Sequence, residues 1–307
     1  MRAFIFPGQG SQSVGMGKAL AEASKDARAV FEEVDEALGQ NLAQLMAEGP
    51  AEELTLTENA QSAIMANAIA TLRASGLDLQ SKADFVAGHS LGEYSALCAA
   101  ATFDLATTAR LLKQRGQAMQ AAVPVGEGAM AALLGADLTI AQAICDAAAE
   151  GEVCTVANDN DPSQVVISGA KAAIDRAVEI AKEKGAKRAI LLPVSAPFHC
   201  PLMKPAADAM QQALAGAKME PPKLSLYANV TAAPVDSPDT IRELLVEQVT
   251  GMVRWRESVA AMAAAGVDHF VEFGGKVLGP MVKRIVPDVE VTSVSSMDDI
   301  DALVKEI

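Results

Sequence analysis

The sequence of 307 residues predicts an α/β protein with a mostly parallel sheet, interrupted by a small ferredoxin-like subdomain. Two observations support this fold class. Short apolar runs alternate with amphipathic stretches, which is typical of strands that alternate with helices. In the middle of the chain the order becomes strand, helix, strand, strand, helix, strand, which is that of the ferredoxin-like unit. We therefore expect a large domain from residues 1–125 and 193–307, and a subdomain from residues 126–192.

The first part of the chain predicts two strands and three helices. Apolar runs at residues 3–6 and 85–87 indicate strands because each is short and bounded by turn-forming residues. Amphipathic stretches at 20–38, 64–75 and 105–122 indicate helices. Only 4% of the residues are aromatic, so we expect an aliphatic core in which alanine-rich helices pack closely on the sheet.

The predicted subdomain lies between glycine-rich punctuation at residues 126–128 and Pro193. Its expected strands are 130–134, 153–156, 164–168 and 188–192, and its expected helices are 139–149 and 171–184. After Pro193 the chain returns to the large domain, with strands expected at 224–227 and 269–272 and helices at 241–250 and 256–265. We expect a cleft between the two units, because ligand sites favour such boundaries.

Residues Gly88–Gly92 fit the pattern G-x-S-x-G, with Ser90 at its centre. The apolar run before them and the helical stretch after them are the context of a nucleophile elbow. Such a turn is so tight that only glycine fits beside the serine. The N–H groups that open the following helix point at any anion that forms there. The motif therefore predicts Ser90 as the nucleophile of an acyl transfer.

A serine nucleophile needs a base, and the chain has three histidines. His89 is expected to point away from Ser90, because neighbouring side chains on a strand face opposite ways. His269 lies in a strand-like run, which favours a structural role. His199 lies in an irregular, proline-rich segment, and we predict it as the base. No Asp or Glu stands out to orient His199, so a carbonyl group is the alternative.

The segment Gly8–Gln12 follows the first predicted strand and is expected to open a helix. Its two glycines resemble the start of a dinucleotide-binding loop, but Ser13 stands where the third glycine of that motif belongs. We therefore reject a nucleotide site. The turn is better suited to aiming a backbone N–H at a neighbouring site, as a second oxyanion donor.

Composition excludes several classes of function. A net charge of −14 argues against nucleic acid as the main partner. No apolar run approaches the roughly 20 residues that span a membrane, and the apolar start is too short for a signal peptide, so we expect a cytoplasmic protein. Four cysteines without C-x-x-C spacing predict reduced thiols and no metal site. They are Cys98, Cys145, Cys154 and Cys200.

Several motifs occur together in one order along the chain: residues 8–12, Gln61, 88–94, 114–116, 195–199 and 274–278. With these motifs the chain closely resembles the malonyl-CoA:acyl-carrier-protein transacylases of bacterial fatty acid synthesis, over essentially its whole length. Acyltransferase domains of polyketide synthases are similar, but they are embedded in much longer chains. The resemblance implies a discrete enzyme.

The resemblance also implies a fold and a reaction. The fold is an α/β-hydrolase-like large domain with a ferredoxin-like insert. The reaction moves a malonyl group from malonyl-CoA to the phosphopantetheine thiol of acyl carrier protein, by a ping-pong mechanism through a malonyl-serine intermediate. Malonyl-CoA and acyl carrier protein are the implied partners, and no metal or redox cofactor is needed.

By position, the resemblance makes Ser90 the nucleophile and His199 the base. Arg115 matches the arginine that holds the malonyl carboxylate, although helical periodicity alone favours an exposed, solvated Arg115. Gln9 and Leu91 match the residues whose backbone N–H groups form the oxyanion hole. The remaining matches are Gln248, whose backbone carbonyl would orient the histidine, and Gln61, Asn158 and Asn160 near the substrate pocket.

Two departures from the family and two alternative functions bear on this interpretation. The family commonly has Gly-Pro-Gly before Lys-Val-Leu, whereas this chain has only Gly274–Gly275, a loop one residue shorter, so the loop is given no binding role. Phe198 before the histidine is a hint of malonyl over methylmalonyl. The alternatives are a serine hydrolase that passes the acyl group to water, and a binding protein with an inactive elbow. An acidic carrier would need a basic docking patch, for which the candidates are Lys187, Arg188, Lys204, Lys283 and Arg284.

Overall fold

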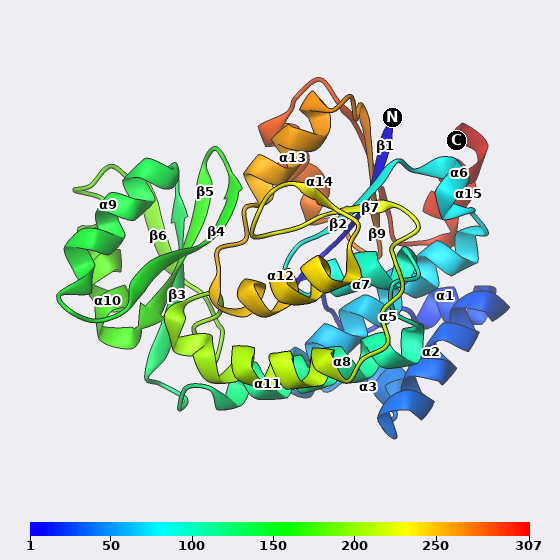
Figure 1. Ribbon diagram of the computed structural model, residues 1–307, viewed down its shortest axis with the longest axis horizontal. Helices are drawn as coiled ribbons and strands as arrows, with labels where there is room; N and C mark the ends of the chain where they lie inside the picture. The colour runs from blue at the N-terminus through cyan, green and yellow to red at the C-terminus, as the bar shows by residue number, and fades with distance from the viewer.

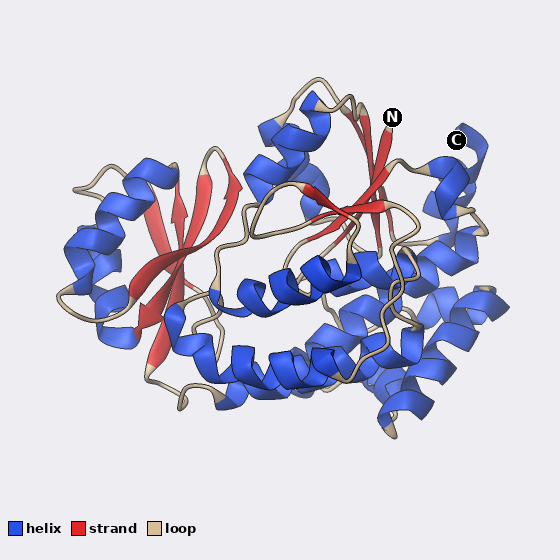
Figure 2. Cartoon of the chain, in the orientation of Figure 1, coloured by secondary structure: helices blue, strands red, loops and turns tan.

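The computed structural model describes all 307 residues and contains two sheets (Figures 1 and 2). The larger sheet has six strands in the order β10-β9-β1-β2-β7-β8, and the smaller has four in the order β4-β5-β3-β6. In the larger sheet all neighbouring strands run parallel except β7 and β8. The prediction of an α/β fold with a mostly parallel sheet is confirmed.

The larger sheet is covered by helices on both faces. Its strands are β1 (Arg2–Phe6), β2 (Phe85–Gly88), β7 (Ser225–Tyr227), β8 (Pro234–Val235), β9 (His269–Phe273) and β10 (Glu290–Val294). The first eight helices are α1 (Lys18–Ala23), α2 (Lys25–Leu38), α3 (Leu42–Glu48), α4 (Ala51–Thr55), α5 (Thr57–Ser75), α6 (Leu79–Lys82), α7 (Gly92–Ala99) and α8 (Leu105–Ala121). The later helices are α11 (Lys204–Ala215), α12 (Pro238–Thr250), α13 (Trp255–Ala264), α14 (Leu278–Ile285) and α15 (Met297–Glu306), with a short 3-10 helix at Pro201–Met203.

Strand β1 shows how alternation divides the core. Phe4 and Phe6 belong to the main cluster, in which α5 packs with α2, α7, α8 and α15, whereas Ala3 and Ile5 belong to a second cluster with α13 and α14. Successive side chains of a strand point to opposite faces, so one buried strand serves both layers. Helix α5 is buried along nearly its whole length, as expected of an alanine-rich helix inside the molecule.

The smaller sheet lies at one end of the molecule, with its two helices on the side away from the larger sheet (Figure 1). It consists of β3 (Gly128–Leu134), β4 (Cys154–Asp161), β5 (Gln164–Ala170) and β6 (Arg188–Leu191), with α9 (Leu138–Ala149) and α10 (Lys171–Ile180). Its strands pair antiparallel, and it has its own cluster of 16 buried apolar residues. The elements follow one another in the predicted order.

Strand β4 connects the smaller sheet to the rest of the chain. Its backbone exchanges hydrogen bonds with Val253, from Val253 N to Ala157 O at 2.9 Å and from Asp159 N to Val253 O at 3.0 Å. Two buried carboxylates on β4 bind arginines of the helices opposite: Asp159 binds Arg256 of α13, and Asp161 binds Arg284 of α14. We call these two ion pairs, with the backbone contact at Val253, the β4 junction.

Four predicted elements differ clearly in the structure. The helix expected at 64–75 begins seven residues earlier, at Thr57. The helix expected at 20–38 is broken at Ser24, which has extended backbone and whose side chain accepts from Ala27 N to cap α2. The segment after β1 does not open a helix, because the first helix begins only at Lys18. Strand β4 runs five residues beyond its predicted end at Val156, because its polar end is buried at the β4 junction. None of the helices has the length and apolar character needed to cross a membrane.

Candidate active site

Ser90 lies in a sharp turn between β2 and α7, with φ of 55° in the left-handed region. A Cβ at Gly88 would come within 1.9 Å of Gly92 C, and a Cβ at Gly92 within 2.2 Å of Phe6 O. Both positions therefore require glycine. A serine with positive φ is strained, and such strain persists only where the surroundings fix it.

Asn229 supplies part of that fixation. Its Oδ1 accepts from Ser90 N at 2.8 Å, and its Nδ2 donates to Gly88 O at 2.7 Å. The sequence analysis did not single out this residue. Asn229 follows β7, which pairs in parallel with β2, so both strands end at the same edge of the sheet. A polar residue just after a buried parallel strand is the signal that could have found it.

His199 is the histidine that meets Ser90. Its Nε2 lies 2.7 Å from Ser90 Oγ, and its Nδ1 lies 2.8 Å from the backbone carbonyl oxygen of Gln248. Because a carbonyl only accepts, Nδ1 carries the hydrogen and Nε2 is free to accept the serine proton. Burial first, and then the positive charge of Arg115, lower the pKa of His199 to about 3. The ring is therefore neutral at neutral pH, as a base must be.

Arg115 points from α8 into the same place and is only 1% exposed. Its Nη1 donates to Gln61 Oε1 at 2.8 Å, and its Nη2 donates to Gln248 Oε1 at 2.8 Å and to Ser90 Oγ at 3.2 Å. Its Nε has no partner. These acceptors are two amides and a hydroxyl, all neutral. The solvated Arg115 that periodicity favours is therefore wrong: α8 packs against both α5 and α11, so it is covered on more than one face.

These groups line a cavity of about 270 Å³, whose lining includes two residues of the smaller sheet and residues of the turns that follow β1 and β2 of the larger sheet. Its lining contains Gln9, Gln61, His89, Ser90, Leu91, Arg115, Met119, Met130, Asn158, Phe198 and His199. Asn160 is not among the lining residues, but its Oδ1 lies 2.8 Å from Nε2 of His89, which lines the cavity. Of the two asparagines matched to the family's pocket, the structure brings Asn158 to the cavity.

Two backbone N–H groups beside Ser90 have no acceptor within the protein, those of Gln9 and Leu91. Leu91 precedes the first residue of α7, where the helix dipole favours an anion. Gln9 is brought near by Gly8, where a Cβ would lie 2.6 Å from His89 O. The Gly8–Gln9 turn thus lies directly against the turn at Gly88–Gly92. The N–H groups of Gln9 and Leu91 both remain free to donate to a ligand.

The other two histidines have other partners, although His89 also lines the cavity. His89 packs edge-on against Trp255 with ring centroids 5.7 Å apart, and burial lowers its pKa. His269 lies in β9 with its Nε2 2.9 Å from Thr292 Oγ1. Both arrangements agree with structural roles. Among the basic docking candidates, Arg284 is engaged at the β4 junction, and Lys204 pairs with Asp208.

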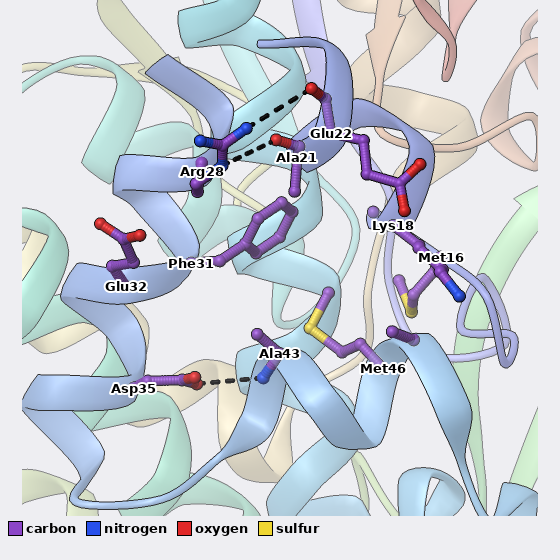
Figure 3. Close-up of a pocket in the computed structure, with 12 residues that line it drawn as sticks. Met16, Lys18, Ala21, Glu22, Arg28, Phe31, Glu32, Asp35, Ala43 and Met46 are labelled. Carbon is purple, nitrogen blue, oxygen red and sulfur yellow. Dashed lines mark hydrogen bonds between the residues drawn. The ribbon is translucent and has the colours of Figure 1, made fainter. Parts of the chain in front are cut away.

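A second cavity of about 270 Å³ lies among α1, α2 and α3 (Figure 3). Phe31 and Met46 give it an apolar lining, and two of its charged side chains, Arg28 and Asp35, already have partners. Arg28 donates to the carbonyls of Ala21 and Glu22, and Asp35 accepts from Ala43 N at 3.0 Å. It contains no pair of nucleophile and base. Volume therefore does not distinguish the two cavities, whereas the contact between Ser90 and His199 does.

Comparisons with known proteins agree with this geometry. Residues 3–275 match the family model described as acyl transferase domain. The chain is 46% identical to the malonyl CoA-acyl carrier protein transacylase of Escherichia coli (strain K12), over 92% of each chain. An acyl-carrier-protein-S-malonyltransferase from Bartonella henselae superposes with a TM-score of 0.97 at 53% identity, covering 99% of this chain and 98% of that one. A malonyl-transacylase solved in complex with a type II PKS acyl-carrier protein superposes with a TM-score of 0.96 at 39% identity, covering 100% and 99%.

Proposed function

The chain belongs to the acyl transferase domain family and, within it, to the malonyl CoA-acyl carrier protein transacylases, and we propose that it moves a malonyl group from malonyl-CoA to acyl carrier protein in fatty acid synthesis. The observation that carries this proposal is the meeting of Ser90, His199 and Arg115 in one cavity. A nucleophile, a base and a buried cation are the groups that transfer of an anionic acyl chain requires.

In the first half of the reaction, Ser90 Oγ attacks the thioester carbonyl carbon of malonyl-CoA while His199 Nε2 takes the hydroxyl proton. The carbon–sulfur bond then breaks. The thiolate of coenzyme A leaves with the proton that His199 carried, and the malonyl group remains as an ester on Ser90. The Gln248 carbonyl holds the ring in the required tautomer throughout.

The charge that develops on the thioester oxygen needs donors, and the free N–H groups of Leu91 and Gln9 are suited to it. Both are backbone groups fixed before the reaction starts, so they need no reorganisation in the transition state. Loss of one such donor costs about 3 kcal/mol in comparable sites. The oxyanion hole is thus made by the turn after β1 and the amino end of α7.

Arg115 makes the site selective for malonyl over acetyl. A planar guanidinium binds a carboxylate through paired hydrogen bonds. Its present partners are neutral amide oxygens, so the incoming malonyl carboxylate brings the first negative charge in direct contact with it. An apolar acyl chain would leave this buried cation without that compensation.

In the second half, the phosphopantetheine thiol of the carrier attacks the carbonyl carbon of the malonyl ester while His199 takes the thiol proton. The bond from that carbon to Ser90 Oγ then breaks, His199 returns the proton to Ser90 Oγ, and the malonyl group leaves as a thioester of the carrier. The solved complex of a similar malonyl-transacylase with its carrier supports this partner. Lys187 and Arg188 are exposed and remain candidates for docking. Each step uses groups of this chain and its two substrates, so we propose no metal or redox cofactor.

Intact-mass measurement tests the proposal. Protein mixed with malonyl-CoA should gain the mass of one malonyl group, and addition of holo carrier protein should remove it and load the carrier. Ser90→Ala should gain nothing. A malonyl adduct that persists in Ser90→Ala contradicts the assigned nucleophile. Rapid release of free malonate without any carrier would instead favour a hydrolase.

A further inference from the structure

One buried side chain, that of Gln248, connects the groups of the site. It is fully buried, and its Oε1 accepts from Arg115 Nη2 at 2.8 Å. Its Nε2 donates to Ser90 O at 3.0 Å and to Glu93 Oε2 at 2.5 Å. The residue whose backbone carbonyl contacts His199 therefore also supports Arg115 through its side chain.

The partners allow only one orientation of this amide. A guanidinium only donates hydrogen bonds, so the oxygen of the Gln248 amide must face Arg115. The backbone carbonyl of Ser90 only accepts, and Glu93 Oε2 accepts here, also from Asn229 N at 3.4 Å, so the nitrogen must face these two. A flipped amide would place two donors against each other at Arg115 and two acceptors at Glu93.

The other support of the guanidinium is weaker. Gln61 Oε1 accepts from Arg115 Nη1, but the Gln61 nitrogen has only the sulfur of Met119 as a partner, at 3.7 Å. A thioether is a weak acceptor, so it restrains the amide little. The direction of the Arg115 guanidinium in the cavity therefore depends mainly on Gln248. The Gln248 nitrogen in turn donates to Glu93 Oε2 at 2.5 Å, to Ser90 O at 3.0 Å and to Asn229 Oδ1 at 3.3 Å, so Glu93 makes the shortest of the three contacts that hold this amide.

We propose that Glu93 is a positioning residue for malonyl selectivity: by accepting from Gln248 Nε2 it fixes the amide that aims the Arg115 guanidinium beside Ser90 Oγ. This inference rests on the proposed function. Glu93 lies in the first turn of α7, is 1% exposed and does not line the cavity. It acts on the substrate only through Gln248 and Arg115.

The hydrogen bond needs an acceptor oxygen, not a charge. Only Oε2 of Glu93 has partners in the protein. Burial raises the pKa of Glu93 to about 8, so the carboxyl group is mostly neutral at neutral pH. An amide oxygen can take its place. Glutamine at position 93 is therefore the conservative replacement, whereas methionine keeps the length, excludes water and offers no strong acceptor.

The test compares malonyl-CoA and acetyl-CoA as donors for Glu93→Met, Glu93→Gln and the unchanged protein, as the ratio of the two kcat/KM values. We expect Glu93→Met to lower the malonyl-to-acetyl ratio about tenfold, because the carboxylate contact alone is weakened, and Glu93→Gln to stay within about threefold of the unchanged protein. Both donors are measured in one preparation, so the amount of folded enzyme cancels.

Glu272 provides the matched control. It is a second buried glutamate at the start of a helix, because from β9 it accepts from the backbone N–H groups of Val277, Leu278 and Gly279 at the start of α14. It also accepts from Ser293 Oγ and lies outside the cavity. Glu272→Met should lower stability and leave the ratio unchanged. If Glu93→Met does not fold, Glu93→Ala gives the same comparison with Glu93→Gln.

The outcomes are distinct. An unchanged ratio in Glu93→Met, or equal losses for both donors, overturns the positioning role, since the second result would point to a structural or Ser90–His199 effect. A glutamine variant as unselective as the methionine variant also overturns it. Failure of the unchanged protein to transfer malonyl would contradict the proposed function instead.

Discussion

In both the candidate site and the β4 junction an arginine binds buried oxygen atoms, but the partners differ: carboxylates at the junction and neutral groups in the site. At the β4 junction Arg256 makes two-point contact with Asp159, whose carboxylate is fully buried, with Nε 2.9 and 3.0 Å from its two oxygens. In the site Arg115 is itself fully buried and is bonded to neutral oxygens. A buried charge without an opposite charge beside it lowers the stability of the protein. We therefore relate the unpaired Arg115 to its proposed role in binding the malonyl carboxylate.

The largest expected effect tests this contrast at Arg115. Arg115→Ala should lower kcat/KM for malonyl-CoA about 100-fold relative to acetyl-CoA, because the malonyl carboxylate would be buried without a partner, at a cost of about 3 kcal/mol. Steady-state transfer to carrier protein measures both donors. Arg256→Ala serves as the control and should keep the ratio. Equal losses for both donors in Arg115→Ala would contradict a role in selectivity.

The second effect is on stability, at the β4 junction. Arg256→Ala leaves the Asp159 carboxylate buried with no other side chain bound to it, which should lower the free energy of unfolding by about 2 kcal/mol. Arg256 is partly exposed, so water limits the loss. Urea unfolding followed by circular dichroism measures it at neutral pH. Full stability in this variant would show that Asp159 is already satisfied without Arg256.

A third, smaller effect appears in the pH dependence of the reaction. The positive charge of Arg115 is the second cause, after burial, of the lowered pKa of His199. Removing a neighbouring positive charge favours the protonated ring, so Arg115→Gln should raise the pKa of His199. In this variant, the acid side of the plot of transfer rate against pH should therefore move to higher pH. As the pH is lowered, transfer from acetyl-CoA should begin to fall at a higher pH in this variant than in the unchanged protein. Coincident pH profiles would contradict electrostatic coupling between the two residues.

Local sequence patterns predicted Ser90 and His199, whereas the residues that support the site are brought there by contacts between distant parts of the chain. Ser90 is set by the turn of its own motif, so sequence reasoning places it directly. His199 follows by elimination among three histidines. Asn229, which binds Ser90, is 139 residues away from it in the sequence, and Glu93 is 155 residues away from Gln248, which it binds. No local period reports such contacts.

The fold, too, has elements that the sequence predicts and elements that depend on contacts between distant residues. Apolar strands and amphipathic helices of the two sheets were predictable from their periods, because burial of one face fixes them. The end of β4 was missed, because Asn158, Asp159 and Asp161 have the composition of a loop. The carboxylates of Asp159 and Asp161 can be buried because the helices opposite supply arginines. Helical periodicity likewise misplaced Arg115, whose burial comes from the packing of α8 between two other helices.

The smallest expected effect distinguishes the two arms of the β4 junction. Asp161 is bound by Arg284, but it also accepts from Ser163 N at 2.8 Å and from Ser163 Oγ at 2.9 Å. Arg284 is nearly half exposed. Arg284→Ala should therefore cost about 1 kcal/mol or less, under the value expected for Arg256→Ala. The same variant also tests Arg284 as a docking residue, because transfer to the carrier and loading from malonyl-CoA can be timed separately. If loading from malonyl-CoA is unchanged while transfer to the carrier slows, Arg284 binds Asp161 and also contacts the carrier. If both rates are unchanged, the role of Arg284 is limited to holding β4 in place.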